Sequence, residues 1–180
     1  MESGARLDWL PQETILFEGA RLGRTLEADV EGDGALLACE AVVLGRTAMG
    51  ERVATGLLRD RWRIRRDGAL VHAEALALGP DLEAVHADAA GLGHHRAFAT
   101  AVLADARSGL ERERLVERVA AIVDAATGGR RDEADARVSA LPGRVVVRAL
   151  AADSRALRRV LVPVLEALGD GRALPRVWHV

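Results

Sequence analysis

The sequence predicts a mainly β fold with two α-helices in its C-terminal half, in which short β-strands form stacked or helical layers. Three observations predict it. Residues 5–78 contain several apolar or alternating runs of strand length, and turn residues separate them. Asp67-Gly68 joins two of these runs and is a strong hairpin signal. Two later segments place apolar residues at helical spacing, and each begins at a capping side chain.

The strands expected before Pro80 are bounded by proline and by turn residues. Proline cannot donate to a ladder, so Pro11 divides residues 5–18 into two short strands. Glu31-Gly32-Asp33-Gly34 is typical of a turn. The remaining expected strands are 21–30, 35–44, 57–66 and 69–78, with a short strand near 52–54.

After Pro80 the pattern changes from strands to a mixture of helices and strands. Residues 81–93 show no regular pattern, and 95–104 reads as a strand. Ser108 and Glu111 form a capping box that starts a helix ending at Gly128. Two strands, 136–140 and 144–150, flank a turn at 141–143. A second helix begins at Asp153 or Ser154 and ends at Gly169, and Pro163 is expected to kink it.

Length and composition restrict the classes of function. A chain of 180 residues is about one domain, so we expect residues 1–180 to form a single unit. The formal net charge of −2 gives no electrostatic case for nucleic acid. The chain has no lysine, which excludes a Walker A loop, a Schiff base and a Ser-x-x-Lys nucleophile.

Compartment signals favour the cytoplasm. The single cysteine, Cys39, excludes an intramolecular disulfide and lies in an expected strand, where we interpret it as a small core residue. No apolar stretch approaches the length of a membrane span, and residues 1–4 do not resemble a signal peptide. We therefore expect a cytoplasmic protein without a membrane partner.

Two glutamates lie in the middle of apolar strands and occupy the same position of an internal echo. Gly-Ala-Leu-x-x-x-Glu begins at Gly34 and again at Gly68, so Glu40 and Glu74 are equivalent. A carboxylate that points into a dry core is costly, so one interpretation is a polar line that forms a wet passage or metal route. The alternative is a structural ion pair on a polar sheet face.

The hairpin register favours the structural alternative for Glu74. If Asp67-Gly68 is a two-residue turn, Arg61 faces Glu74 and Arg63 faces His72. Trp62, Ile64 and Val71 then share the opposite, core-facing side of the hairpin.

Arginines and one exposed loop indicate a protein partner. Arginine alternates along one expected strand, at positions 59, 61, 63 and 65, and arginine is well suited to interface ion pairs. The loop after Gly45 places Met49 between Arg46 and Glu51. A soft apolar residue between opposite charges suits a protein better than a small substrate.

Several stretches together resemble the urease accessory protein UreD family, called UreH in some organisms. They are L-P-Q-E-T-I-L-F-E-G-A-R-L (10–22), E-A-V-V-L-G-R-T-A-M-G-E (40–51), G-L-L-R-D-R-W-R-I-R-R-D-G (56–68), L-P-G-R-V-V-V-R-A-L (141–150) and P-R-V-W (175–178). The resemblance extends over nearly the whole chain in the family's order. It covers about the C-terminal two-thirds of the family pattern, because family members carry further strands before the L-P-Q-E stretch. Without those strands we expect bare sheet edges.

The resemblance implies a non-catalytic urease maturation factor in the cytoplasm. Such a protein binds apo-urease together with UreF and the GTPase UreG, and it assists nickel insertion, with a homodimer within the activation complex as a further expectation. It holds no permanent cofactor and meets nickel only transiently. We take Glu40, Glu51, Glu74 and His72 as the candidate nickel path, and Arg46, Met49, Asp60, Arg61 and Arg63 as candidate contact or fold-defining positions.

Two other classes of function stay open from the residues. One is a generic β interaction module with no link to metal. The other is a small-molecule enzyme that uses buried Glu40 or Glu74 as an acid–base group. A pocket that joins either glutamate to His72 would favour this enzyme.

Overall fold

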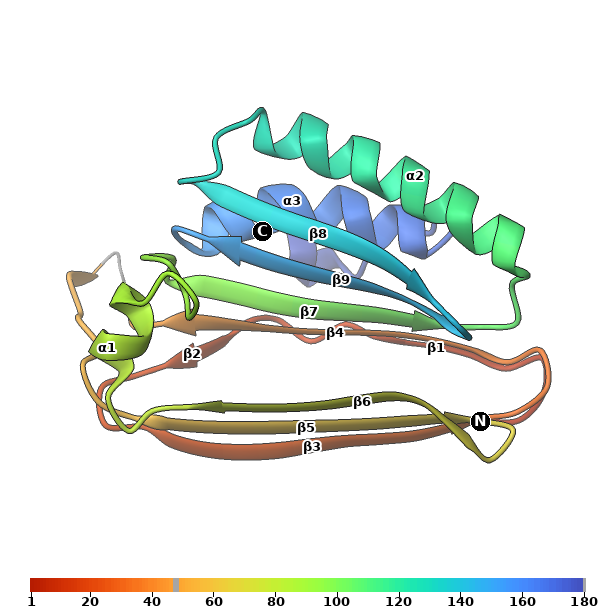
Figure 1. Ribbon diagram of the computed structural model, residues 1–180, viewed down its shortest axis with the longest axis horizontal. Helices are drawn as coiled ribbons and strands as arrows, with labels where there is room; N and C mark the ends of the chain where they lie inside the picture. Colours follow the sequence, from red (N-terminus) through yellow and green to blue (C-terminus); the bar gives the residue numbers. More distant parts are fainter. Residues whose placement is uncertain (47–48, 180) are drawn as a thin grey trace.

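In this computed structural model, which describes residues 1–46 and 49–179, two β-sheets stack face to face and two helices cover the larger one (Figure 1). The larger sheet contains β1 (Arg6–Trp9), β2 (Thr14–Leu16), β4 (Ala35–Leu44), β7 (Ala97–Ala104), β8 (Ala134–Leu141) and β9 (Arg144–Ala151). The smaller sheet contains β3 (Arg21–Val30), β5 (Leu57–Arg66) and β6 (Ala69–Leu78). The helices are α1 (Leu82–Ala87), α2 (Gly109–Thr127) and α3 (Ser154–Leu168), followed by a 3₁₀ turn at Arg176–His179. The predicted mainly β fold with two helices in the C-terminal half is confirmed.

The first five strands wind between the two sheets. The chain places β1 and β2 in the larger sheet, crosses to β3, returns to β4 and crosses again to β5. On its return β4 pairs in parallel with β1 and β2, and β5 pairs in parallel with β3. This is one turn of a coil of strands, which gives the stacked layers that the sequence predicts.

The coil ends in edge strands. In the described part of the chain β1 and β2 pair only with β4, and β3 pairs only with β5. Large apolar side chains are exposed on or beside β1 and β2, namely Leu7, Trp9, Ile15 and Phe17. Exposed apolar side chains therefore lie along these edge strands.

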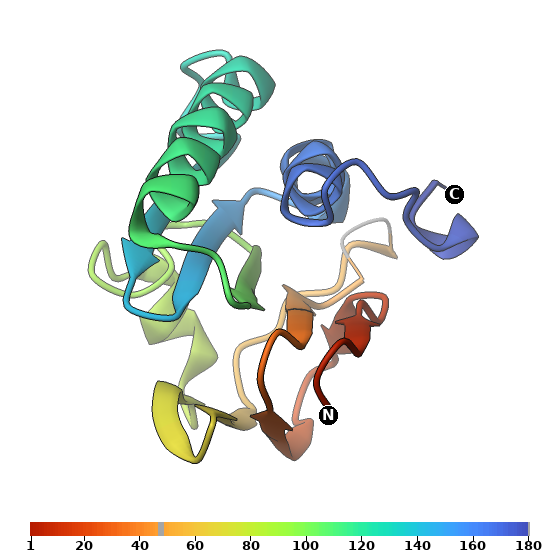
Figure 2. The same ribbon diagram turned by 90° about the vertical axis from the view of Figure 1, so that its right-hand side faces the viewer.

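The helix-covered face of the larger sheet forms an apolar core. Alternate β4 residues, beginning at Leu37, point toward the helices, and Leu157, Leu161 and Leu165 of α3 are buried against them. Figure 2 shows α2 and α3 on the same side of the strands. The predicted capping box starts α2, because Glu111 N–H donates to Ser108 Oγ at 3.3 Å and Ser108 N–H donates to Glu111 Oε2 at 2.8 Å. Helix α3 continues through Pro163.

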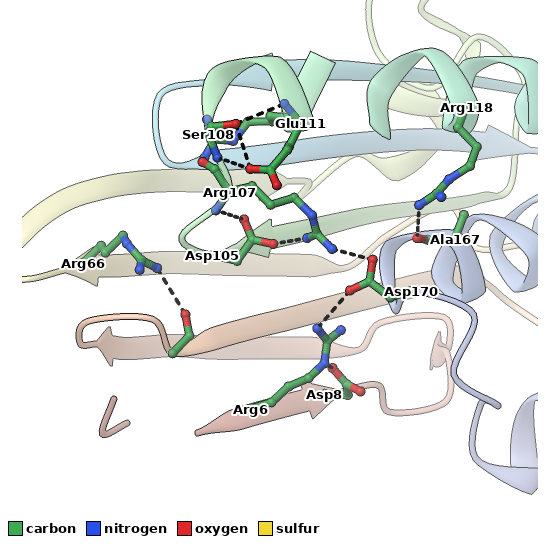
Figure 3. A network of polar contacts seen from close by, with 12 residues as sticks. Arg6, Asp8, Arg66, Asp105, Arg107, Ser108, Glu111, Arg118, Ala167 and Asp170 are labelled. Carbon is green, nitrogen blue, oxygen red and sulfur yellow. Dashed lines mark hydrogen bonds and ion pairs between the residues drawn. The ribbon is translucent and has the colours of Figure 1, made fainter. Parts of the chain in front are cut away.

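A polar network connects the helical layer to the edge of the sheet (Figure 3). Arg107, which lies between β7 and α2, pairs with Asp105 and with Asp170 just after α3. Asp170 also lies 3.8 Å from Arg6 of β1, which in turn pairs with Asp8 at 2.9 Å. The beginning of α2, the end of α3 and the edge strand β1 are therefore held together at one end of the molecule.

Two local predictions are wrong. Residues 81–93 are not wholly irregular, because Asp81 caps α1 by accepting a hydrogen bond from Ala84 N–H at 2.9 Å. The segment 52–54 forms no strand; only an isolated bridge between Thr55 and Asp81 is present there. A six-residue helix is too short to show helical periodicity in sequence. In the part of the chain that is described, no helix combines the length and apolar character that crossing a membrane requires.

Candidate functional site: a polar layer between the two sheets

A β-bulge decides which side chains of β6 point between the sheets. Next to the turn Arg66 pairs with Ala69 and Arg65 with Leu70, but the following pair is Ile64 with His72. Val71 is the extra residue, so every later pair is shifted by one. The predicted pairs of Arg61 with Glu74 and Arg63 with His72 are therefore wrong, because the prediction assumed an uninterrupted ladder.

The bulge places His72 and Glu74 on the inner side of the smaller sheet. Glu74 now pairs with Trp62, and both Trp62 and Ile64 are buried as predicted. Arg61 and Arg63 point to the opposite, exposed side. Glu74 therefore does not pair with Arg61; its ion pair is with Arg148.

Arg24 of β3 is the centre of the first polar cluster between the sheets. Its Nη1 lies 2.7 Å from Oε2 of Glu40, and its Nε and Nη2 donate to Oδ2 of Asp60 at 2.9 and 2.7 Å. Two indole N–H groups complete the cluster. Trp9 Nε1 donates to Glu40 Oε1 at 3.0 Å, and Trp62 Nε1 donates to Asp60 Oδ1 at 3.0 Å. Both carboxylates are therefore paired and hydrogen-bonded inside the protein.

Glu74 is the centre of the second cluster. Its Oε1 accepts a hydrogen bond from Thr100 Oγ1 at 3.0 Å, and its Oε2 lies 2.6 Å from Arg148 Nη2. His72 Nε2 is 3.7 Å from the same oxygen. The three partners come from β6, β7 and β9, so this cluster also connects the two sheets.

Thr100 joins the two clusters into one layer. It is the register partner of Glu40 on the neighbouring strand, while its hydroxyl donates to Glu74. We call the resulting set the polar layer; its members are Arg24, Glu40, Asp60, Glu74, Thr100 and Arg148, with His72 beside them. Apolar residues fill the space between the sheets on both sides of the layer and form two separate groups. One group contains Val42 and Leu58, and the other contains Ala38 and Trp62.

The polar layer is buried in its middle and reaches solvent at both ends. The side chains of Glu40 and Glu74 are 12% and 16% exposed, whereas the Arg148 side chain is 63% exposed. Trp9, at the other end, is 49% exposed. The layer thus crosses the molecule from the β1/β3 edge to the edge formed by β6, β8 and β9.

A cavity lies at each end of the layer. One, of about 540 Å³, is lined by Trp9, Arg24, Glu40 and Asp60 together with apolar residues of β1 and β3. The other, of about 470 Å³, is lined by residues that include Glu74, Thr100, Arg137 and Arg148. The two predicted mid-strand glutamates therefore open into different cavities and belong to one polar layer.

His72 is the one buried imidazole of the layer. It is 3% exposed, and its Nε2 has no hydrogen-bond partner. Burial lowers the pKa of His72, Glu74 raises it in part, and Arg144 and Arg148 lower it further. The imidazole is therefore neutral near pH 7 and has a nitrogen available as a ligand. Within residues 1–46 and 49–179 no group of three or more metal-binding side chains converges, so this structure contains no preformed cage.

Glu51, Arg46 and Met49 form a separate surface loop. Arg46 donates to Glu51 Oε2 from Nε at 2.9 Å and from its backbone N–H at 3.1 Å, and these hydrogen bonds lower the pKa of Glu51. The Arg46 guanidinium also lies 4.9 Å from the centre of the Phe17 ring. Met49 is 75% exposed. Thr47 and Ala48 of the same motif lie outside the described residues.

The structure separates the predicted site residues into three places. Glu40, Glu74, His72 and Asp60 lie in or beside the polar layer, Arg46, Met49 and Glu51 lie in the loop, and Arg61 and Arg63 lie on the outer sheet face. Asp60 is 6% exposed and so is placed inside the protein. Sequence reasoning missed Arg24, Thr100 and Arg148. Their signal was the one that revealed Glu40, a polar residue within an otherwise apolar strand face.

Fold and polar layer together define a two-sheet protein, covered by helices on one side, whose charged interior opens at both edges. A family model described as UreD urease accessory protein matches residues 1–179. The chain belongs to the UreD urease accessory protein family. Members of this family are accessory proteins and not catalysts, which replaces the acid–base enzyme as an interpretation of Glu40 and Glu74.

Individual relatives carry the same description. The chain is 48% identical to the urease accessory protein UreD of Rhizobium leguminosarum bv. viciae over 98% of its own length and 60% of that protein's. The identity is 44% to the UreD of Agrobacterium fabrum, over 98% of this chain and 58% of the relative. The identity is 45% to the UreD of Xanthobacter autotrophicus, over 98% of this chain and 57% of the relative. The chain therefore spans about three-fifths of the length of the curated relatives it matches.

Proposed function

We propose that this chain is a non-catalytic urease maturation factor that acts in the cytoplasm, binds apo-urease together with UreF and UreG, and assists nickel insertion. Family membership supports the maturation role. The polar layer is the single observation that supports a part in nickel transfer, because it places Glu40, Glu74 and His72 along one line between two cavities.

The layer has the chemistry that a passing divalent cation requires. Carboxylate oxygens and a neutral imidazole are nickel ligands of ordinary strength, and no three of them form a closed site among the described residues. A path must bind an ion weakly at each step, since a tight cage retains it. The layer meets this condition by presenting one or two ligands at a time.

Arginine keeps the layer closed when no ion is present. Each glutamate has one guanidinium partner, Arg24 for Glu40 and Arg148 for Glu74. A cation that enters from either cavity competes with that guanidinium for the carboxylate. In our proposal the ion pairs open as nickel passes and close again behind it, so the empty path keeps its charges satisfied.

The loop and the outer sheet face are the proposed contact surfaces of the scaffold. Met49 is exposed beside the Arg46–Glu51 ion pair, and Arg61 and Arg63 project from the uncovered face of the smaller sheet. Glu51 accepts hydrogen bonds from Arg46, so we assign it to shaping this loop and not to the polar layer.

Binding and nickel delivery are separable in one experiment. We would mix the full chain with apo-urease, UreF and UreG, measure complex formation by size-exclusion chromatography, and then measure urease activity after adding nickel, bicarbonate and GTP. The variants are Glu40→Gln and Glu74→Gln, which keep the shape of each side chain. Glu113→Gln, at an exposed position of α2, is the matched control.

We expect all variants to form the complex and both polar-layer variants to lower urease activation by about tenfold or more, because each removes a charged ligand from the path. Glu113→Gln should activate like the unaltered chain. Normal activation by both polar-layer variants contradicts the nickel path and leaves the scaffold role intact. If the unaltered chain forms no complex with any of the three partners, the scaffold role itself is wrong.

A further inference from the structure

The outer face of the smaller sheet carries a row of exposed arginines. Arg59, Arg61 and Arg63 alternate along β5 and point away from the other sheet. Among the described residues, no layer covers this face (Figure 1). Within the described chain none of the three guanidinium groups has a hydrogen bond or an ion pair, whereas Arg24 on the inner side of the same sheet pairs with two carboxylates.

Small side chains lie along one side of this arginine row. Its cross-strand partners on β6 are Ala77, Ala75 and Ala73, all exposed. A hollow of about 350 Å³ between Arg61 and Arg63 is lined by Ala73 and Ala75. The row therefore borders a strip of small apolar side chains on which another backbone can approach closely.

On the β3 side of the row, the neighbouring residues reduce the positive charge at the Arg63 end. The β3 partners of Arg59 and Arg61 are Gly23 and Thr25, which carry no charge, whereas the partner of Arg63 is Glu27. The positive charge is thus concentrated at the end of the sheet where Arg59 and Arg61 lie.

We propose that the arginine row, with its alanine strip, is the docking surface for an acidic protein surface of the urease assembly. The inference rests on the proposed function and names the chemistry of one partner. Alternate side chains of a strand are about 7 Å apart. Three guanidinium groups at this spacing suit a segment with carboxylates at matching intervals, because arginine binds carboxylate in a planar, two-point manner.

A protein partner fits this surface better than a nucleic acid does. Protein interfaces combine arginine with a close-packed apolar strip, and both are present here. The whole chain has a formal net charge of −2, so its long-range field does not attract a polyanion.

The test compares two triple charge reversals. In the first, Arg59, Arg61 and Arg63 are each replaced by Glu; in the control, three exposed arginines elsewhere, Arg114, Arg131 and Arg172, are replaced in the same way. Affinity for purified apo-urease and, separately, for the UreF–UreG pair is measured at low and at physiological salt. Circular dichroism and thermal unfolding establish that both variants fold.

We expect the first variant to lose affinity for one of the two probes by about tenfold or more, with a smaller salt dependence, because carboxylate then meets carboxylate. The control should bind like the unaltered chain. If the folded first variant binds both probes as tightly as the unaltered chain does, the docking surface is overturned while the proposed function stands. Equal weakening by both variants also overturns it, because the effect then follows net charge. Lack of binding by the unaltered chain contradicts the proposed function instead.

Discussion

The two faces of the larger sheet are built differently, although they alternate along the same strands. On β4 the residues that face the helices are Leu37, Cys39, Ala41 and Val43, and all are apolar and buried. The residues that face the smaller sheet are Leu36, Ala38, Glu40, Val42 and Leu44, and a carboxylate lies at their centre. The helix-facing side belongs to one continuous apolar core, whereas on the other side charged residues separate the apolar residues into two groups.

We propose that the helix side of this sheet serves stability and that the side facing the smaller sheet serves function. Burial raises the pKa of Cys39, on the helix side, to about 12, so that thiol stays protonated and inert. Glu40 is the next residue along the strand, yet it points into a layer with two cavities and ion-pair partners from both sheets. A buried ion pair contributes little net stability, which is consistent with our proposal that the polar layer serves function.

The largest expected effect is on the helix side. Leu161→Ala removes a side chain of α3 that is 1% exposed and leaves a cavity under the helix. We predict a loss of about 2 to 5 kcal/mol in the free energy of unfolding, measured by urea denaturation. Leu110→Ala, at a position that is 58% exposed, is the control and should change this free energy by less than about 0.5 kcal/mol. Equal losses in the two variants would mean that α3 is not packed as described.

Removing the central arginine of the polar layer should have the second-largest effect. Arg24→Met leaves Glu40 and Asp60 without their shared cation inside the protein. We predict that the free energy of unfolding falls by about 3 kcal/mol at neutral pH and recovers in part at acid pH, where the carboxylates are protonated. Arg21→Met on the exposed side of the same strand should have almost no effect. A stable Arg24→Met protein with no pH dependence would show that the two carboxylates are in free contact with water.

The strands and the two long helices were predictable from the sequence, and so was the presence of the carboxylates of Glu40 and Glu74 within apolar strands; the expected hairpin register put Glu74 on the wrong face. Local turn and capping chemistry determines the bounds of the strands and helices, and each glutamate stands out because it interrupts an apolar strand. The partners of these glutamates were not predictable. The partners of Glu74 depend on one extra residue, Val71, in the hairpin. The partner of Glu40, Arg24, comes from β3, which lies against β4 only because the strands coil between the two sheets. Neither a bulge nor a crossing between sheets has a reliable signal in a single sequence.

A smaller effect is expected from the buried imidazole. Burial depresses the folded-state pKa of His72, although Glu74 partly opposes the shift. The unfolded state therefore binds more protons below about pH 6.5, so stability is fully present above that pH and falls as the pH is lowered toward the folded-state pKa. In metal-free protein, His72→Gln should flatten the dependence of the unfolding midpoint on pH between 7 and 5. The slope for one proton cannot exceed about 1.4 kcal/mol per pH unit.

His86 is the control for this prediction, because burial and Arg96 also depress its pKa and it lies outside the polar layer. His86→Gln should remove only its own share of the slope. An unchanged pH profile for His72→Gln would mean that water reaches the imidazole in the folded protein.

The smallest effect belongs to the helical layer. Ser108→Ala removes the side-chain acceptor of the α2 capping box and should lower the free energy of unfolding by about 1 kcal/mol. Ser139→Ala at an exposed strand position is the matched control and should be neutral. Neither substitution touches the polar layer, so both variants should activate urease normally once folded. Impaired activation by folded Ser108→Ala protein would contradict the division between the two faces.

The most direct test of the central claim is the nickel content of urease after maturation. Complexes containing the unaltered chain, the Glu40→Gln/Glu74→Gln double variant or the folded Leu161→Ala variant are supplied with nickel, and metal bound per urease subunit is measured by mass spectrometry. We predict that the double variant forms the complex yet leaves urease largely without nickel, while Leu161→Ala protein, kept below its unfolding temperature, delivers nickel normally. Full nickel loading with the double variant would contradict the claim that the face between the two sheets carries the function.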